Sequence, residues 1–143
     1  MSQENINLVR SLHDAFSEGN LEKATALVAD DFEWKIIAFG LTLNGHAGFR
    51  QGFEAFGGPF PGAQLNYKNV ADGNDQVVVE YDFVGTHTGT FITPTGSIPP
   101  TGRPVHIPGI EAFRVRNGKI ISLHTYFDTA TMLAQLGVMP QPA

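Results

Sequence analysis

The sequence predicts an α+β fold in which a curved antiparallel sheet wraps around N-terminal helices on its concave side. Apolar side chains show helical spacing over residues 6–28, strand-like alternation dominates the second half, and turn residues divide that half at short intervals. Helices followed by a run of strands pack as two layers. A curved sheet that is covered on one side by helices leaves a pocket at its open end.

The N-terminal part is expected to be helical. Apolar residues recur at helical spacing from Ile6 to Phe16, and the Gly-Asn pair at residues 19–20 is expected to end this helix. Residues 21–28 are predicted as a second short helix. His13 lies on the apolar stripe of the first helix, where we expect a core histidine with its hydrogen bonds satisfied.

The next segment mixes strands with one helix. Apolar and charged residues alternate over residues 32–36, which predicts a half-buried strand that carries the only tryptophan, Trp34. Residues 41–44 are predicted as a second strand and residues 46–56 as a helix. Glycines and prolines over residues 57–62 are expected to end that helix in a turn.

The remainder is predicted to be mostly sheet. Leu65 and Tyr67 alternate with polar residues, an Asp-Gly-Asn turn follows at residues 72–74, and residues 77–83 alternate again. A strand over residues 85–91, a proline-stiffened crossover and a hairpin then lead to a short closing helix. Asp128 is expected to cap that helix, because Thr131 lies three residues later.

The last hairpin turns at Asn117-Gly118, and its register decides which side chains face the pocket. With a two-residue turn, Glu111 lies opposite His124 and each face mixes polar with apolar residues. With a three-residue turn over residues 117–119 and a bulge at Gly118, Glu111 lies opposite Thr125. We prefer the second register because it separates the two kinds of residue, with an apolar face of Phe113, Val115, Ile121, Leu123 and Phe127.

Glu111 is the leading catalytic candidate. The preferred register places it among apolar neighbours, where loss of solvation favours the neutral acid and suits a general acid or base. The alternative is a carboxylate near the sheet edge that is solvated or paired with a nearby arginine.

His87 is the second catalytic candidate. It follows the inward parity of Tyr81 and Phe83, so it is predicted to reach the pocket mouth and to position or protonate a substrate oxygen. The alternative is a histidine whose hydrogen bonds fix the Thr-His-Thr-Gly turn. Inward-facing residues are predicted either to bind substrate or to pack as core, and these are Trp34, Tyr67, Tyr81, Phe113, Thr125 and Phe127.

The composition suits one globular domain over residues 1–143, with 42% hydrophobic and 16% charged residues. The net charge of -5 is dispersed and the basic residues form no run, so no nucleic acid is expected as a partner. No segment has the length of an apolar membrane span, and the first residues lack a signal pattern. We therefore expect no membrane partner and a cytoplasmic location, which the absence of cysteine fits.

Metal and cofactor motifs are missing from the sequence. The five histidines lack the short spacings of metal ligands, and no carboxylate cluster completes a set. No phosphate-binding loop, nucleophile elbow or dinucleotide fingerprint occurs. We expect no metal and no cofactor, so any enzyme of this sequence would rely on its own side chains.

Three motifs stand in the second half of the chain: THTG at residues 86–89, PPTGR at residues 99–103 and FRVRNGKI at residues 113–120. With Asp128 and the closing Gln-Leu-Gly at residues 135–137, they resemble the SnoaL-like polyketide cyclase, or ester cyclase, branch of the nuclear-transport-factor-2-like superfamily. The resemblance extends in layout to the whole chain. It implies a cone-shaped, cystatin-like α+β barrel.

The resemblance also implies a cofactor-free aldol catalyst. In such enzymes an aspartate of the last strand is the acid and base, and a histidine on the preceding strand assists it. Carried over by position, the aspartate falls at Thr125 and the histidine at Glu111. Because a threonine hydroxyl does not abstract a carbon-bound proton, we expect Glu111 to serve as the base in a rearranged site.

These observations together predict a pocket for a small hydrophobic or aromatic carbonyl compound, or a polyketide-like one, and lyase, isomerase or cyclase chemistry. Glu111 would move the proton, His87 and Thr125 would orient oxygens, and the aromatic residues would bind rings. The alternatives are a noncatalytic ligand-binding or accessory module and a protein whose open sheet face is an interaction surface. We also expect a homodimer or a higher homo-oligomer.

Overall fold

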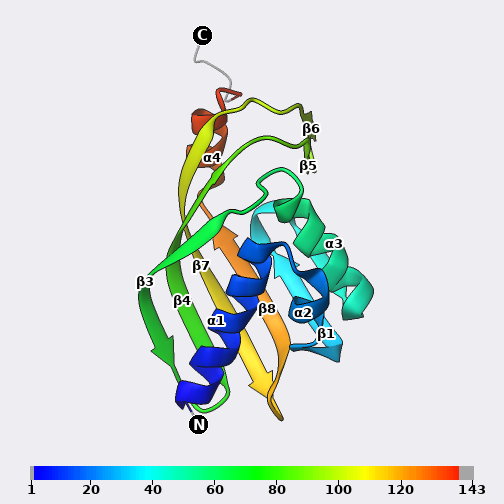
Figure 1. The fold of residues 1–143 in the computed structure, drawn as a ribbon, viewed down its shortest axis with the longest axis vertical. Helices are drawn as coiled ribbons and strands as arrows, with labels where there is room; N and C mark the ends of the chain where they lie inside the picture. The colour runs from blue at the N-terminus through cyan, green and yellow to red at the C-terminus, as the bar shows by residue number, and fades with distance from the viewer. Residues whose placement is uncertain (1, 139–143) are drawn as a thin grey trace.

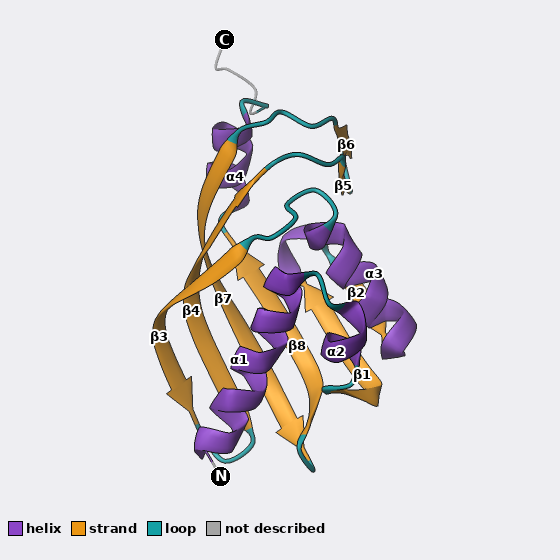
Figure 2. Ribbon diagram, in the orientation of Figure 1, coloured by secondary structure: helices purple, strands orange, loops and turns teal. Residues whose placement is uncertain are grey.

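The computed structural model describes residues 2–138, and it has helices on one side of a curved sheet (Figure 1). Helix α1 packs on one half of the sheet, α3 packs on its other half, and α4 lies at the opposite end from the N-terminus (Figure 2). The predicted α+β fold is confirmed. The helices are α1 (Ser2–Glu18), α2 (Leu21–Thr25), α3 (Gly45–Gly57) and α4 (Thr129–Leu136), with a 3₁₀ turn η1 (Ile37–Phe39).

The main sheet has six strands in the order β2-β1-β8-β7-β4-β3. Most neighbours are antiparallel, as predicted, but β1 and β8 are parallel, so the sheet is mixed. No hairpin joins these two strands, and their long separation in the chain permits a parallel pair. The strands are β1 (Val28–Ile36), β2 (Leu41–Asn44), β3 (Gln64–Asp72), β4 (Gln76–Thr86), β7 (Pro104–Arg116) and β8 (Lys119–Phe127).

Predictions for three segments of the chain need correction before the final hairpin is considered. The strand predicted over residues 85–91 does not form as one element, because β4 ends at Thr86 and the next strand begins at Phe91. The crossover between β4 and β7 contains a small hairpin of β5 (Phe91–Thr93) and β6 (Gly96–Ile98), whose strands are too short to show alternation. The second helix ends at Thr25, earlier than predicted, because the chain joins the sheet there. The backbone N–H of Ile120 donates to the carbonyl of Leu27 at 2.9 Å, and Val28 pairs with Ile120.

The final hairpin combines features of both predicted registers. Its turn has two residues, since Arg116 pairs with Lys119 and both Asn117 and Gly118 have positive φ, at 52° and 73°. This is the geometry that an Asn-Gly pair favours. The predicted three-residue turn is therefore wrong.

The register further along β8 is nevertheless the preferred one, with Glu111 opposite Thr125. The extra residue that produces it is Ile121, because Arg114 pairs with Ser122 while Val115 pairs with Ile120. Ile120 is consequently the fully buried residue, and Ile121 lies half-buried. The bulge shifts the register by one residue, so the side chains of β8 beyond it lie on the opposite faces from those they would otherwise occupy. The turn itself stays regular.

Asp128 caps α4, as predicted. The hydroxyl of Thr131 donates to Oδ2 of Asp128 at 2.6 Å, and the backbone N–H of Thr131 donates to Oδ1 at 3.0 Å. These hydrogen bonds from Thr131 hold the pKa of the Asp128 carboxyl below its usual value. The side chain is exposed at the start of a helix, which explains its presence without any catalytic role.

Two apolar clusters form the interior. The larger one lies between the sheet and helices α1 and α3, and the smaller one joins α4 to the end of the sheet and the β5–β6 hairpin. Within residues 2–138, none of the helices has both the length and the apolar character needed to span a membrane. The larger cluster borders the cavity described below.

The close approach of Trp34 to α3 depends on Gly52. A Cβ added at Gly52 would collide with Cζ3 of the Trp34 ring. Alanine favours a helix over glycine by about 1 kcal/mol, but overfilling a packed core costs about 1–3 kcal/mol. We expect Gly52→Ala to lower the free energy of unfolding in urea by about 1–2 kcal/mol.

Gly57→Ala is the matched control, because its added Cβ would lie 3.6 Å from the Phe16 ring, an ordinary contact. We expect no loss of stability there. A Gly52→Ala protein as stable as the wild type would show that Trp34 does not rest on α3 as described.

Candidate functional site

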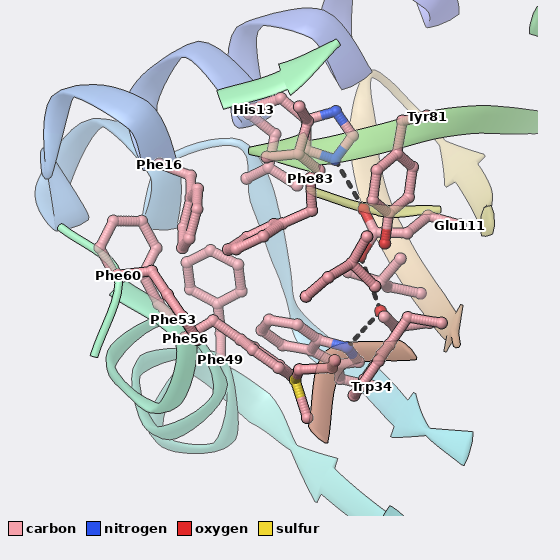
Figure 3. Close-up of a pocket in the computed structure, with 17 residues that line it drawn as sticks. His13, Phe16, Trp34, Phe49, Phe53, Phe56, Phe60, Tyr81, Phe83 and Glu111 are labelled. Carbon is pink, nitrogen blue, oxygen red and sulfur yellow. Dashed lines mark hydrogen bonds and ion pairs between the residues drawn. The ribbon is translucent and has the colours of Figure 1, made fainter. Parts of the chain in front are cut away.

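An apolar cavity lies between α1, α3 and the concave face of the sheet (Figure 3). Its volume is about 70 Å³. Phenylalanines from α1, α3, β4 and β8 supply much of the wall. The lining residues are Leu12, His13, Phe16, Trp34, Phe49, Phe53, Phe56, Phe60, Leu65, Tyr81, Phe83, Ile107, Glu111, Leu123, Thr125, Phe127 and Met132.

A chain of hydrogen bonds runs along one wall of this cavity. Nε1 of Trp34 donates to Oγ1 of Thr125 at 2.9 Å, and that hydroxyl donates to Oε2 of Glu111 at 2.7 Å. Oε1 of Glu111 lies 2.6 Å from Nε2 of His13. The other ring nitrogen of His13, Nδ1, lies 2.5 Å from the Tyr67 hydroxyl. Both carboxylate oxygens of Glu111 are thus held in place.

These five residues come from five elements that the fold brings together. The β7–β8 register sets Glu111 opposite Thr125, and Thr125 pairs with Ile36 of β1, two residues beyond Trp34. His13 projects from α1 and Tyr67 from β3 (Figure 3 shows His13, Glu111 and Trp34 along the same wall). The arrangement therefore depends on the bulge in β8, since a shift of one residue would turn Thr125 to the other face.

The direction of the first two hydrogen bonds is fixed by chemistry. An indole N–H can only donate, so Thr125 must accept from Trp34 and use its single proton toward Glu111. The predicted role of Thr125 as a contact for a substrate oxygen therefore finds no support in its geometry. Its hydroxyl orients Glu111.

Tyr81 places a second polar group in the cavity. Tyr81 is buried and pairs with Gly109 of β7, and its hydroxyl forms no hydrogen bond with any group in residues 2–138. A Cβ added at Gly109 would lie 2.7 Å from the Tyr81 oxygen, so glycine is needed there. Burial, assisted by the charge of Glu111, raises the pKa of Tyr81 well above its usual value. Tyr81 is therefore a neutral phenol that can donate a hydrogen bond to a ligand.

Tyr67 of β3 is the last residue of the hydrogen-bond chain, and it contacts His13 of α1. Burial and the charge of Glu111 raise the pKa of its hydroxyl above the usual value. The guanidinium carbon of Arg10 lies over the Tyr67 ring, 4.5 Å from its centroid. Tyr67 thus remains protonated, with a cation covering its face.

The structure brings most of the sequence-predicted site residues together. Glu111 and four of the predicted substrate contacts line the cavity, namely Trp34, Tyr81, Thr125 and Phe127. Tyr67 and Phe113 are not among the lining residues. Phe113 is fully buried and packs edge-on against His13, with ring centroids 5.5 Å apart. Phe113 is therefore a core residue, which was the alternative to substrate binding in the sequence prediction.

His87 lies outside the lining of this cavity. It packs between the rings of Phe60 and Phe91, and its Nδ1 accepts from the backbone N–H of Thr101 at 3.2 Å. Burial lowers the pKa of His87, so the ring is neutral. His87 is fully buried, as its inward parity predicts, but β4 ends at Thr86, so the parity does not indicate which part of the interior the ring enters. The structure favours the alternative, a histidine that fixes the Thr-His-Thr-Gly turn.

His13 is the residue that sequence reasoning underestimated. It is buried with its hydrogen bonds satisfied, as expected, but its partner is Glu111. A signal was present, because a polar residue on an apolar helix stripe needs a buried partner and so does a carboxylate on an inward strand position. Two such residues within one small core are expected to meet.

Known proteins resemble this chain in sequence and in fold. The family model described as "SnoaL-like domain" matches residues 9–123. No curated protein matches the chain.

Solved structures share the fold over nearly the whole chain. A candidate SnoaL-like polyketide cyclase from Jannaschia sp. CCS1 has a TM-score of 0.85 at 20% identity, covering 97% of this chain and 95% of that one. IdmH, a candidate polyketide cyclase from Streptomyces antibioticus, has a TM-score of 0.77 at 28% identity, covering 92% and 97%. A protein from Catenulispora acidiphila DSM 44928 with a ketosteroid isomerase-like fold, in complex with trimethylamine, has a TM-score of 0.77 at 20% identity, covering 94% and 97%.

Proposed function

This chain belongs to the family of SnoaL-like domains, and we propose that it binds a small apolar carbonyl compound and transfers a proton at the carbon next to the carbonyl. One observation carries the proposal. A carboxylate held by two hydrogen bonds, Glu111, and a phenol with a free hydroxyl, Tyr81, share a cavity that is otherwise apolar. An apolar ligand with one carbonyl group fits this cavity, because its apolar part would contact the phenylalanines and its carbonyl oxygen would accept from Tyr81.

The chemistry follows from the two polar groups. Glu111 takes a proton from the carbon next to the carbonyl, and the electron pair of the broken C–H bond forms the double bond of an enolate. The Tyr81 hydroxyl donates a hydrogen bond to the carbonyl oxygen as negative charge grows on it. Glu111 then returns the proton to another atom of the ligand, which completes an isomerisation, an elimination or a ring closure.

The comparisons support the ligand class in general terms. The Jannaschia and Streptomyces proteins are described as candidate polyketide cyclases, and the Catenulispora protein was solved with a small molecule, trimethylamine. Polyketides contain repeated carbonyl groups whose neighbouring carbons are acidic. A polyketide-like compound is therefore the finer proposal for this chain.

The size of the cavity limits the ligand. A volume of about 70 Å³ is well below the roughly 300–1,000 Å³ of sites for drug-sized molecules. We infer that the ligand has at most one ring, and that even one ring needs the wall to move, because the cavity that binds benzene in an engineered protein has about 150 Å³. A larger compound would enter only if half-buried phenylalanines such as Phe56, Phe83 and Phe127 turned aside.

The first test uses cyclohex-3-en-1-one, a one-ring ketone whose acidic carbon lies between a carbonyl and a double bond. Proton transfer converts it to the conjugated cyclohex-2-en-1-one, which is followed by ultraviolet absorbance. We expect the wild-type protein to accelerate this conversion beyond acetate buffer. Quenching of Trp34 fluorescence by the ketone without conversion would favour the noncatalytic binding module. The absence of both quenching and conversion would contradict the proposal.

Tyr81 is expected to contribute to the rate rather than to binding. Removing one hydrogen-bond donor from a developing oxyanion typically costs about 10²–10³-fold in rate. We expect Tyr81→Phe to lower kcat for the ketone by about 10²-fold and to leave Trp34 quenching nearly unchanged. Gly109→Ala is expected to act in the same direction, because it displaces the Tyr81 hydroxyl.

Tyr126→Phe is the matched control, since Tyr126 is 43% exposed and lies outside the cavity lining. It should leave the rate unchanged. Equal rates in Tyr81→Phe and in the wild type would remove Tyr81 from the proposed chemistry.

A further inference from the structure

The hydrogen-bond chain of Trp34, Thr125, Glu111, His13 and Tyr67 has one fixed end and one reversible end. The Trp34 end is fixed, because the indole can only donate and Thr125 therefore donates to Oε2 of Glu111. Oε1 of Glu111 faces His13 instead. Any reversal of direction has to occur between Glu111 and Tyr67.

His13 couples the two remaining hydrogen bonds to each other. Its Nε2 lies 2.6 Å from Glu111 and its Nδ1 lies 2.5 Å from the Tyr67 hydroxyl, so both ring nitrogens are engaged. A neutral imidazole has one N–H donor and one acceptor. When Nε2 donates to ionised Glu111, Nδ1 accepts from Tyr67. When protonated Glu111 donates to Nε2, Nδ1 donates to the Tyr67 oxygen.

These two arrangements differ by one proton, and neither places a charge on His13. The distances suit both, since a short contact of this kind accommodates a hydrogen bond in either direction. In the second arrangement the Tyr67 proton must point away from His13. It therefore needs a partner outside the chain.

The Tyr67 end of the chain lies nearest to solvent. Trp34, Thr125, Glu111 and His13 are all buried, with at most 7% of the residue exposed, whereas Tyr67 is half-buried. The charged groups that act on Tyr67 are Arg10, Asp14 and Glu111. Around the cavity, Tyr81 of β4 is the other titratable group that faces Glu111, and the lining residues from α3, β1 and β8 include none.

We propose that Tyr67 and His13 form a proton path that connects Glu111 to solvent from the side of α1 and β3, and that His13 changes its neutral tautomer each time Glu111 takes up or releases a proton. The inference rests on the proposed acid and base function of Glu111. Tyr67 and His13 are positioning residues in this account, because they act on a ligand only through Glu111.

Loading of Glu111 moves three protons, and solvent supplies the first. A proton from water binds to the Tyr67 oxygen while the phenol proton moves to Nδ1 of His13. The proton on Nε2 moves to Oε1 of Glu111. One proton leaves the solvent, Glu111 becomes neutral, and His13 and Tyr67 both end neutral. The reverse sequence returns Glu111 to its base form.

The path gives Glu111 a route to solvent that a ligand does not block. His13 also lines the cavity, but at 2.6 Å the contact between its Nε2 and Oε1 of Glu111 leaves no space for a ligand atom, so a ligand that fills the cavity leaves this contact in place. Glu111 can then gain a proton from solvent or release one to it while a ligand occupies the cavity.

Nitrogen-15 NMR of the full chain labelled at histidine tests the path, because protonated and unprotonated ring nitrogens have widely separated shifts. His13→Gln assigns the signals, and carbon-13 at the glutamate carboxyl groups reports the state of Glu111. As Glu111 becomes neutral on acidification, we expect the proton of His13 to disappear from Nε2 and to appear on Nδ1. Glu111→Gln is expected to keep one tautomer throughout.

Tyr67→Phe tests the outer end of the path. Without the hydroxyl that passes a proton to Nδ1, exchange between the two tautomers should slow, and its relaxation dispersion on the microsecond to millisecond scale should be lost. Tyr126→Phe is the matched control and should retain the dispersion.

The proposal is overturned if His13 carries protons on both nitrogens while Glu111 is ionised, if its tautomer ignores the titration of Glu111, or if Tyr67→Phe exchanges like the wild type. These results are separate from those of the ketone assay. A tautomer change in a protein that does not isomerise the ketone would remove the proposed function alone, and an active protein with a fixed tautomer would remove the path alone.

Discussion

Replacing Glu111 by glutamine is expected to abolish most of the conversion of cyclohex-3-en-1-one. Glutamine keeps the size of the side chain and can still accept from Thr125, but it cannot take a proton from carbon. General acid and base catalysis contributes about 10²–10⁴-fold, so we expect kcat to fall by about 10³-fold in Glu111→Gln. The rate is measured by absorbance of the conjugated ketone, and binding is followed in parallel by fluorescence of Trp34.

Glu80→Gln is the control for this change, because Glu80 is exposed on β4 and does not line the cavity. It should convert the ketone at the wild-type rate. If Glu111→Gln also retained full turnover while remaining folded, another group would have to be the base.

Removing His13 is expected to have the largest effect on stability. Glu111 is 6% exposed, and its Oε1 depends on His13 for its hydrogen bond. Removing the hydrogen-bond partner of a buried carboxylate leaves its charge without compensation, and the loss of one partner from a buried ion pair, the nearest comparable change, costs about 3–5 kcal/mol. We expect His13→Leu to lower the free energy of unfolding in urea by that amount, about 3–5 kcal/mol.

The double variant His13→Leu with Glu111→Leu provides the control. Replacing both members of a buried pair by apolar residues is often nearly neutral, so most of the stability should return. A single His13→Leu variant as stable as the wild type would mean that the Glu111 side chain is solvated and that the pair is not buried as described.

The final hairpin shows how far a sequence carries a structural prediction. The contrast between an apolar and a polar face was sufficient to set Glu111 opposite Thr125. It was not sufficient to locate the bulge, because a bulge at Gly118 and one at Ile121 produce the same register at Glu111. The preference of Asn-Gly for a two-residue turn favours the bulge at Ile121. The prediction gave more weight to the separation of the apolar face from the polar face.

The site shows what periodicity cannot supply. Alternation along a strand predicted the inward direction of Trp34, Tyr81 and Glu111, all of which line the cavity. It gave no information about which helix residue would face them, since the packing of α1 on the sheet is a tertiary contact. The buried position of His13 was predicted from the sequence, but its contact with Glu111 was found only in the structure.

His87 illustrates the opposite error. Its inward direction, extrapolated from β4, agrees with its full burial, but the chain leaves the sheet after Thr86 and His87 contacts the loop around Thr101 instead of lining the cavity. A periodic pattern has no meaning beyond the end of its element. The single domain over residues 1–143, the homo-oligomer, the cytoplasmic location and the absence of a metal or cofactor stay predictions.

The most direct test of the account is the carbon-13 signal of the Glu111 carboxyl group as a ligand enters. The protein is labelled at glutamate, Glu111→Gln identifies the signal, and cyclohex-2-en-1-one is added while Trp34 fluorescence reports binding. We predict that the Glu111 signal moves in proportion to the bound fraction while the signal of exposed Glu80 stays in place. A ketone that quenches Trp34 and leaves the Glu111 signal unmoved would contradict the claim that Glu111 meets the ligand in this cavity.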